Sequence, residues 1–210
     1  MSCGIEEYIY LYPVNTPTNT EIDNYIQFVL PSSQPSSVFT GYRIYYRIYL
    51  SGNNSNNPAL ESDWNRISQV NSTPALIVDL LENTLLYKEL SFYKENTDER
   101  AYPSLKADST GIKYKIEFNK AVEPNYVALI EYDTADTIQN YYQMCRWESV
   151  SQEAKMLFEY STNLAGSDVS SSTTEPNKAD ALFIIVATGF SGTTIMSAAT
   201  RLGVLALPLP

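Results

Sequence analysis

The chain has 210 residues, of which 44% are hydrophobic, so it can bury a core as one large domain or two small ones. Its net charge is −10 and it has no run of Lys or Arg, which excludes a basic nucleic-acid-binding surface and electrostatic attachment to anionic lipid. It has no histidine and only two cysteines, which excludes Ser-His-Asp and Cys-His catalysis and a zinc site built from histidines or from thiolates alone. We therefore predict no catalytic residue, no metal ion and no cofactor.

Tyrosine is unusually frequent, with 17 Tyr against 7 Phe, and it favours strands. Apolar residues alternate with other residues along several segments, which is typical of strands. The predicted strands, in chain order, lie at residues 22–30, 42–50, 112–118, 126–132 and 182–187. In the second of these, one face carries Tyr42, Ile44, Tyr46, Ile48 and Leu50, and the other carries Arg43, Tyr45, Arg47 and Tyr49.

Helical signals are few. Pro58 suits the first position of a helix on which Leu60, Trp64 and Ile67 share a face. Residues 73–81 fit a short helix or a strand, and a helical turn is expected at 151–155, whereas the Ser- and Thr-rich residues 167–176 indicate a long exposed loop. The predicted fold class is mostly β: an antiparallel β-sandwich with one to three short helices.

The strand at 42–50 carries a candidate ligand-binding ladder of four side chains, Arg43, Tyr45, Arg47 and Tyr49. Guanidinium and aromatic groups on one face can bind carbohydrate or anionic ligands, and tyrosine is enriched at recognition surfaces. The favoured interpretation is that the ladder packs under a loop or stacks against a neighbouring strand.

Pairs of carboxylates are the other chemical candidates. The pairs are Glu6 with Glu7, Asp98 with Glu99, and Asp133 with Asp136. Glycoside hydrolysis needs two acids that face each other across a substrate, one of them shielded from water. The favoured interpretation is that these acids lie in solvated loops. Asp133 and Asp136 also match no complete calcium loop.

The opening residues Met1, Ser2, Cys3 and Gly4 resemble the mature end of a bacterial envelope lipoprotein, of the kind that spirochaetes and other bacteria display. In that family the signal peptide is cut before the cysteine, which is then lipidated. The resemblance implies a lipid on Cys3, a tether over residues 1–7 and a location in the cell envelope. Contact with the membrane is then expected only through this lipid.

Residues 39–46 resemble the third strand of fibronectin type III-like domains, and residues 181–197 resemble their last hairpin. This resemblance implies an immunoglobulin-like sandwich over residues 8–210. Because more than a hundred residues separate the two segments, two packed β-units, about 8–105 and 106–210, are an alternative.

The leading hypothesis is a non-enzymatic binding or adhesion module of the cell envelope, whose partner is an unknown protein or glycan. A structural subunit that associates through strand edges is the alternative. A carboxylate-based hydrolase is a second alternative.

Overall fold

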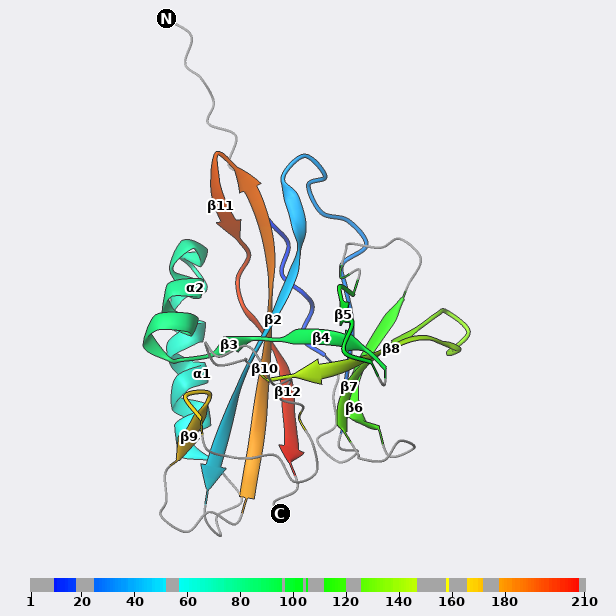
Figure 1. Ribbon diagram of the computed structural model, residues 1–210. Helices are drawn as coiled ribbons and strands as arrows, with labels where there is room; N and C mark the ends of the chain where they lie inside the picture. Colours follow the sequence, from blue (N-terminus) through cyan, green and yellow to red (C-terminus); the bar gives the residue numbers. More distant parts are fainter. Residues whose placement is uncertain are drawn as a thin grey trace, which may run out of the picture.

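Two β-sheets pack face to face, and a helical segment covers the outer face of one of them (Figure 1). The computed structural model describes residues 10–17, 25–51, 57–95, 97–103, 105, 112–119, 126–146, 158, 166–171 and 178–207. The predicted class, a mostly β antiparallel sandwich with short helices, is confirmed. Cys3, the predicted tether at 1–7 and the expected helical turn at 151–155 lie outside the described residues.

Among the described residues, sheet A has six strands, all joined in antiparallel pairs. In spatial order they are β1 (Tyr25–Val29), β6 (Lys113–Asn119), β7 (Tyr126–Tyr132), β8 (Ile138–Cys145), β4 (Ser91–Lys94) and β5 (Arg100–Ala101). The alternation in β6 sets its orientation: Tyr114 and Ile116 are buried in the core, while Lys113, Lys115 and Glu117 lie on the opposite, half-buried face.

Sheet B is built on two long strands, β2 (Phe39–Ser51) and β10 (Lys178–Ser191), which pair antiparallel. On its other side β10 pairs with β11 (Thr193–Met196) and then with β12 (Thr200–Leu207). Gly192, at φ +73°, makes the turn between β10 and β11, a conformation that favours glycine.

Three short segments pair with the edge of β2 that faces away from β10. Tyr42 donates its N–H to the carbonyl of Leu105, β3 (Lys88–Glu89) pairs antiparallel, and β9 (Val169–Ser171) pairs parallel. The prediction of an exposed loop over 167–176 is therefore wrong for its first part, because β9 lies there and the preceding Asp168 is buried.

The helical layer begins at α1 (Pro58–Val70), where Asn57 accepts the N–H of Leu60 as a cap. Leu60 and Ile67 are buried against sheet B, as their spacing predicts. Residues 73–81, for which the sequence left helix and strand open, are helical. The turns are η1 (Pro74–Leu76), α2 (Ile77–Asp79) and the π-helical η2 (Leu80–Thr84).

The two long strands of sheet B, β2 and β10, are consequently buried on both faces over most of their length. The predicted inner face of β2, from Tyr42 to Leu50, packs in the core between the sheets, and Tyr45 and Tyr49 of its other face pack beneath the helices. β10 is buried continuously from Ala179 to Gly189. Each sheet contains strands from both sides of residue 105 in the sequence. The boundary between the two alternative β-units, 8–105 and 106–210, therefore does not separate one sheet from the other.

One ion pair is buried where the two sheets meet. Arg146 follows β8 of sheet A and Asp168 precedes β9 of sheet B, and their side chains are 1% and 5% exposed. Arg146 donates from Nε and Nη2 to the two Asp168 oxygens at 2.8 and 2.6 Å, and the Tyr46 hydroxyl donates to Oδ2 at 2.7 Å. Gly166 leaves the space for this pair, because a Cβ there would lie 2.6 Å from Asp168 Oδ1.

We expect Asp168→Asn to destabilise the fold by about 3–5 kcal/mol, because it leaves the buried Arg146 guanidinium without its counter-charge. Urea denaturation measures this change. As a matched control, Glu99→Gln breaks the exposed Lys94–Glu99 pair and is expected to cost less than about 1 kcal/mol. Equal costs for the two variants would show that the buried pair does not hold the sheets together.

Candidate functional site

The predicted ladder on β2 lies against the helical layer. Tyr45 and Tyr49 have no exposed surface, and the side chain of Arg47 is 13% exposed. Arg43, at 43%, is the most open of the four and lies 3.6 Å from Glu89 of β3. The structure thus brings the four residues together on one face but leaves mainly Arg43 accessible to solvent.

The polar ends of the ladder meet partners within the fold. Asp63 of α1 accepts hydrogen bonds from Tyr49 at 2.7 Å and from Arg47 at 3.3 Å. The Tyr49 hydroxyl also lies 2.8 Å from that of Tyr87, and Arg47 donates to the carbonyl of Leu85, just after η2. This network joins β2 to α1 and to the end of the helical turns.

Burial in this network changes how the tyrosines ionise. Desolvation raises the pKa of Tyr49 well above its usual value, and the neighbouring Tyr87 and Asp63 raise it further. Desolvation likewise raises the pKa of Tyr45, whose hydroxyl donates to Glu82 at 2.9 Å. A ligand-binding role for the ladder stays a prediction, and in this arrangement Arg43 offers a ligand the most exposed side chain.

The acid pairs of the second alternative lie in exposed turns wherever they are described. Asp133 accepts the N–H groups of Ala135 and Thr137 at 2.8 and 2.9 Å, which closes the β7–β8 turn, and Asp136 pairs with Lys113 at 2.7 Å. Neither contact is the shielded, facing arrangement that glycoside hydrolysis needs.

Of the other two acid pairs, one lies outside the described residues, Glu6 with Glu7. In the other, Glu99 pairs with Lys94 on the surface. Within the described ranges, no group of three or more Cys, Asp or Glu side chains is placed to hold a metal ion.

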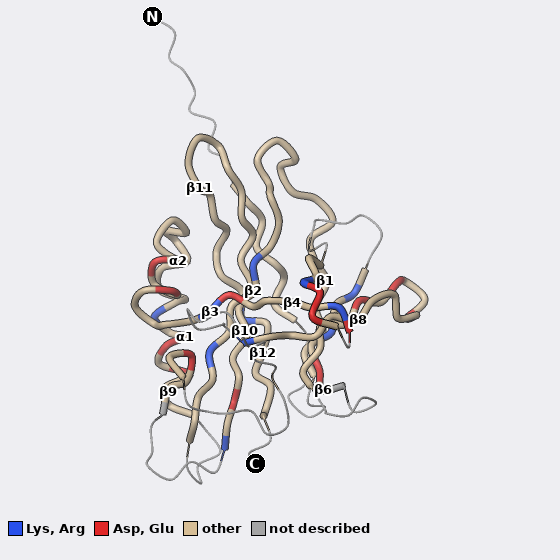
Figure 2. Tube along the Cα trace, viewed as in Figure 1, with Lys and Arg blue, Asp and Glu red and all other residues tan. Residues whose placement is uncertain are grey.

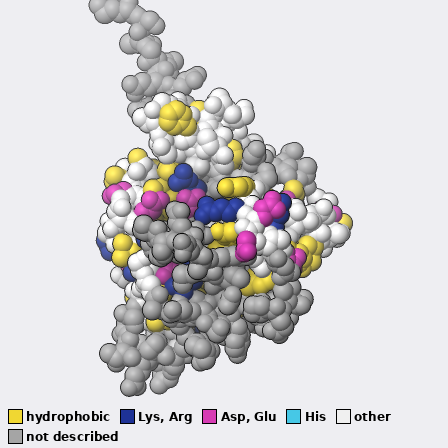
Figure 3. All heavy atoms as spheres, in the orientation of Figure 1, with side chains coloured by type: hydrophobic (Ala, Val, Ile, Leu, Met, Phe, Trp, Pro, Cys, Tyr) yellow, Lys and Arg dark blue, Asp and Glu magenta, His cyan; other side chains and the backbone are white. Residues whose placement is uncertain are grey.

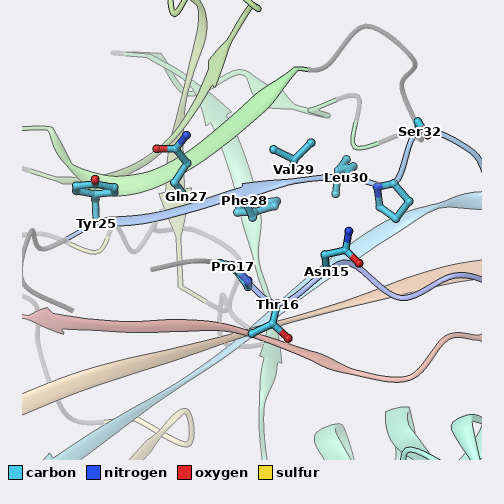
Figure 4. A pocket seen from close by; sticks show the side chains of 10 residues that line it. Asn15, Thr16, Pro17, Tyr25, Gln27, Phe28, Val29, Leu30 and Ser32 are labelled. Atoms are coloured by element: carbon cyan, nitrogen blue, oxygen red, sulfur yellow. The ribbon is translucent and has the colours of Figure 1, made fainter. Parts of the chain in front are cut away.

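Residues 10–17 close one side of the sandwich. Leu11 and Val14 are buried in the core between the sheets, and the Val14 carbonyl accepts a hydrogen bond from Thr200 of β12 at 2.7 Å. Figure 4 shows Asn15, Thr16 and Pro17 between β1 and β12. The segment thereby leaves a groove on either side.

The groove beside β1 has a volume of about 490 Å³ and is lined by residues 15–17, β1 and the chain that follows β1 (Figure 4). The second groove, of about 700 Å³, lies between residues 16–17, α1 and β12, and we call it the α1–β12 groove. Its larger side chains are Trp64 and Glu61 of α1, Asn71 just after α1, and Arg201 of β12.

The side chains of the α1–β12 groove are held in place by bonds across it. Arg201 donates to both carboxylate oxygens of Glu61 at 2.9 and 3.0 Å, and Asn71 exchanges two hydrogen bonds with the backbone of Ala199. Trp64 is half-buried. An aromatic ring, a fixed ion pair and an amide in one hollow are the groups that bind partners at recognition sites.

The described part of the chain contains no helix that is both long and apolar enough to cross a bilayer.

We expect the fold to lose stability above about pH 10. Desolvation raises the pKa of Tyr45, Tyr49 and Tyr87 in the folded state, and it raises that of Tyr142 to about 12. Unfolded tyrosines ionise near pH 10, so the stabilisation is complete below that pH and is lost as the pH rises through the folded-state pKa values.

Tyrosinate absorbance recorded together with circular dichroism tests this pH dependence. Some tyrosines are expected to ionise near pH 10 with the fold intact, and the buried ones only as the fold is lost. Ionisation of all tyrosines near pH 10 without unfolding would contradict the buried network.

No match to this chain was found among protein-family models, curated proteins or solved structures. The resemblances of residues 1–4 to a lipoprotein end and of residues 39–46 to a fibronectin type III strand therefore stay predictions. A function for the chain has to be inferred from its own residues and their geometry.

Proposed function

We propose that the chain is a non-enzymatic binding module of the bacterial cell envelope, anchored by a lipid on Cys3, whose partner is a protein or a glycan. The α1–β12 groove is the observation that carries the binding role. It is a hollow of about 700 Å³, lined by a tryptophan and by polar groups that are already fixed.

Pre-organisation supports binding at this groove. The bidentate Arg201–Glu61 pair fixes two long side chains that would otherwise lose conformational freedom when a partner binds. Their side chains are 23% and 51% exposed, so they still present charge to a partner. Trp64 lies three residues after Glu61, which places both on the same side of α1.

The chemistry of the chain supports binding over catalysis. The sequence has no histidine, so a general base would have to be a carboxylate, a tyrosine or a lysine. Of the acids that the sequence singled out, Asp133 accepts turn hydrogen bonds, and Glu99 and Asp136 pair with lysine on the surface. A binding module needs none of these groups to titrate near neutral pH.

The edge of β12 favours a second candidate, a structural subunit that associates through strand edges. Within the described ranges, β12 pairs as a strand with β10 alone, and residues 199–204 form one wall of the groove. An extended segment of another chain would add to this edge as a further strand.

We expect substitutions in the α1–β12 groove to weaken partner binding. Trp64→Ala and Arg201→Ala are each expected to reduce affinity about tenfold, because fixed aromatic and arginine side chains dominate binding energy. Calorimetry with soluble peptidoglycan fragments, other oligosaccharides and extended peptides measures the change. Arg66→Ala, at an exposed arginine of α1 outside the groove lining, is the matched control.

A glycan or a peptide that binds the native chain and responds to these substitutions supports the binding module. Reversible oligomers without either ligand favour the structural subunit instead. A ligand that binds both groove variants as tightly as the native chain places binding elsewhere, and no binding by any probe contradicts the proposed role of the groove.

We expect a lipid to be attached at Cys3 when the full gene is expressed in a bacterium. Metabolic labelling with an alkyne fatty acid, followed by mass spectrometry, detects it. Cys3→Ser is expected to abolish the label and Cys145→Ser to retain it, because Cys145 is buried in β8. An unlabelled native protein would remove the argument for envelope localisation.

A further inference from the structure

The hairpin between β10 and β11 and the loop before β2 lie together at one end of the molecule (Figure 1). Phe190 donates its N–H to the carbonyl of Val38 at 2.8 Å, and Leu11 lies 3.2 Å from the position of a Cβ on Gly189. Three segments therefore meet here. We call them the uncharged end: residues 10–12, 31–38 and 189–195.

Charge is absent from this end although 18% of the residues in the chain are charged. Residues 8–20, 24–42 and 181–200 contain no Asp, Glu, Lys or Arg. Core strands explain part of these stretches, but exposed loops and hairpin tips normally carry charge. In Figure 2 the hairpin of β10 and β11 and the loop before β2 are tan throughout, whereas blue and red residues mark the rest of the molecule.

Exposed aromatic rings stand at the same end. Phe190 is 59% exposed, Tyr10 53% and Tyr12 51%. Figure 3 shows apolar side chains there among uncharged polar surface. The backbone of Tyr12 is fixed by Gln34, whose side chain accepts its N–H at 2.9 Å and donates to its carbonyl at 2.6 Å. Hydrogen bonds therefore fix the backbone at two of these three rings, Tyr12 and Phe190.

We propose that the uncharged end lies in the headgroup region of a lipid bilayer. The inference rests on the proposed lipid anchor at Cys3. Tyr10 follows Cys3 by seven residues, which span at most about 25 Å when fully extended. A lipid on Cys3 therefore keeps Tyr10, and with it the uncharged end, within about 25 Å of the membrane.

The physical chemistry of this end suits the bilayer surface. Tyrosine is enriched at membrane interfaces because its ring is apolar and its hydroxyl is polar. Carboxylates would be repelled by anionic headgroups, and this end has none, whereas the chain as a whole has a charge of −10. The acidic body then points away from the membrane. The α1–β12 groove, with its charged Glu61 and Arg201, lies on that body.

Coupling through Cys3 separates this proposal from the proposed acylation. The full chain is attached at Cys3 to phosphatidylcholine vesicles that carry a maleimide lipid, with Cys3→Ser as the coupling control. Trp64→Phe and Trp147→Phe remove the native tryptophans. In this background Phe190→Trp reports on the uncharged end, and Tyr102→Trp is the matched probe at an exposed aromatic on the chain after β5, with 83% exposure.

Brominated phosphatidylcholine is expected to quench the Phe190→Trp protein about twofold and to leave the Tyr102→Trp protein unchanged, since an interfacial ring sits about 5–10 Å into the headgroup boundary. Equal quenching of the two probes, or none, overturns the proposal. A blue shift that grows with protein density without quenching overturns it in favour of self-association. None of these results depends on whether Cys3 is acylated in the cell, because the maleimide lipid replaces the natural one. The metabolic labelling experiment tests acylation separately.

Discussion

The structure depends on one constraint, the burial of β2 and β10 on both of their faces. One face of this strand pair packs against sheet A and the other beneath the helical layer. In a doubly buried strand pair, hydrogen bonds to partners offset the cost of burying polar side chains. Tyr45, Arg47 and Tyr49 meet Glu82, Asp63 and Tyr87 on one side, and Tyr46 meets Asp168 on the other.

The regions with proposed roles are attached to this strand pair at different places. The uncharged end is built where β2 begins and where β10 turns into β11. The α1–β12 groove lies between a strand that pairs with β10 and a helix that packs on β2. A rigid pair of strands would thus hold a membrane-facing end and a partner-binding groove at a fixed separation, as an anchored binding module requires.

Local patterns in the sequence predicted the elements that have a clear period. The two faces of β2, the alternation of β6 and the apolar face of α1 follow from side-chain spacing alone. β8 was missed because Ile138–Cys145 mixes polar and aromatic residues without regular alternation. Asp168 was placed in an exposed loop because serine and glycine surround it, and its burial depends on Arg146, 22 residues earlier.

The groove could not be predicted because its walls are far apart in the chain. Glu61 and Arg201 are separated by 140 residues, so no spacing rule connects them. The one sequence feature that pointed to the groove was Arg201, an isolated charge in an apolar C-terminal region. The ladder was predicted correctly as one face of a strand, but its burial follows from the helical layer, whose packing on β2 is a long-range contact.

Native-state hydrogen exchange of the amides in β2 and β10 tests the central constraint most directly. If both faces of this pair are buried, amides over residues 44–50 and 181–187 should exchange only through global unfolding, with protection equal to the full free energy of unfolding. The amides of β1 and β5, at the edges of sheet A, should exchange sooner through local opening. Exchange in β2 and β10 as fast as at those edges would contradict the account.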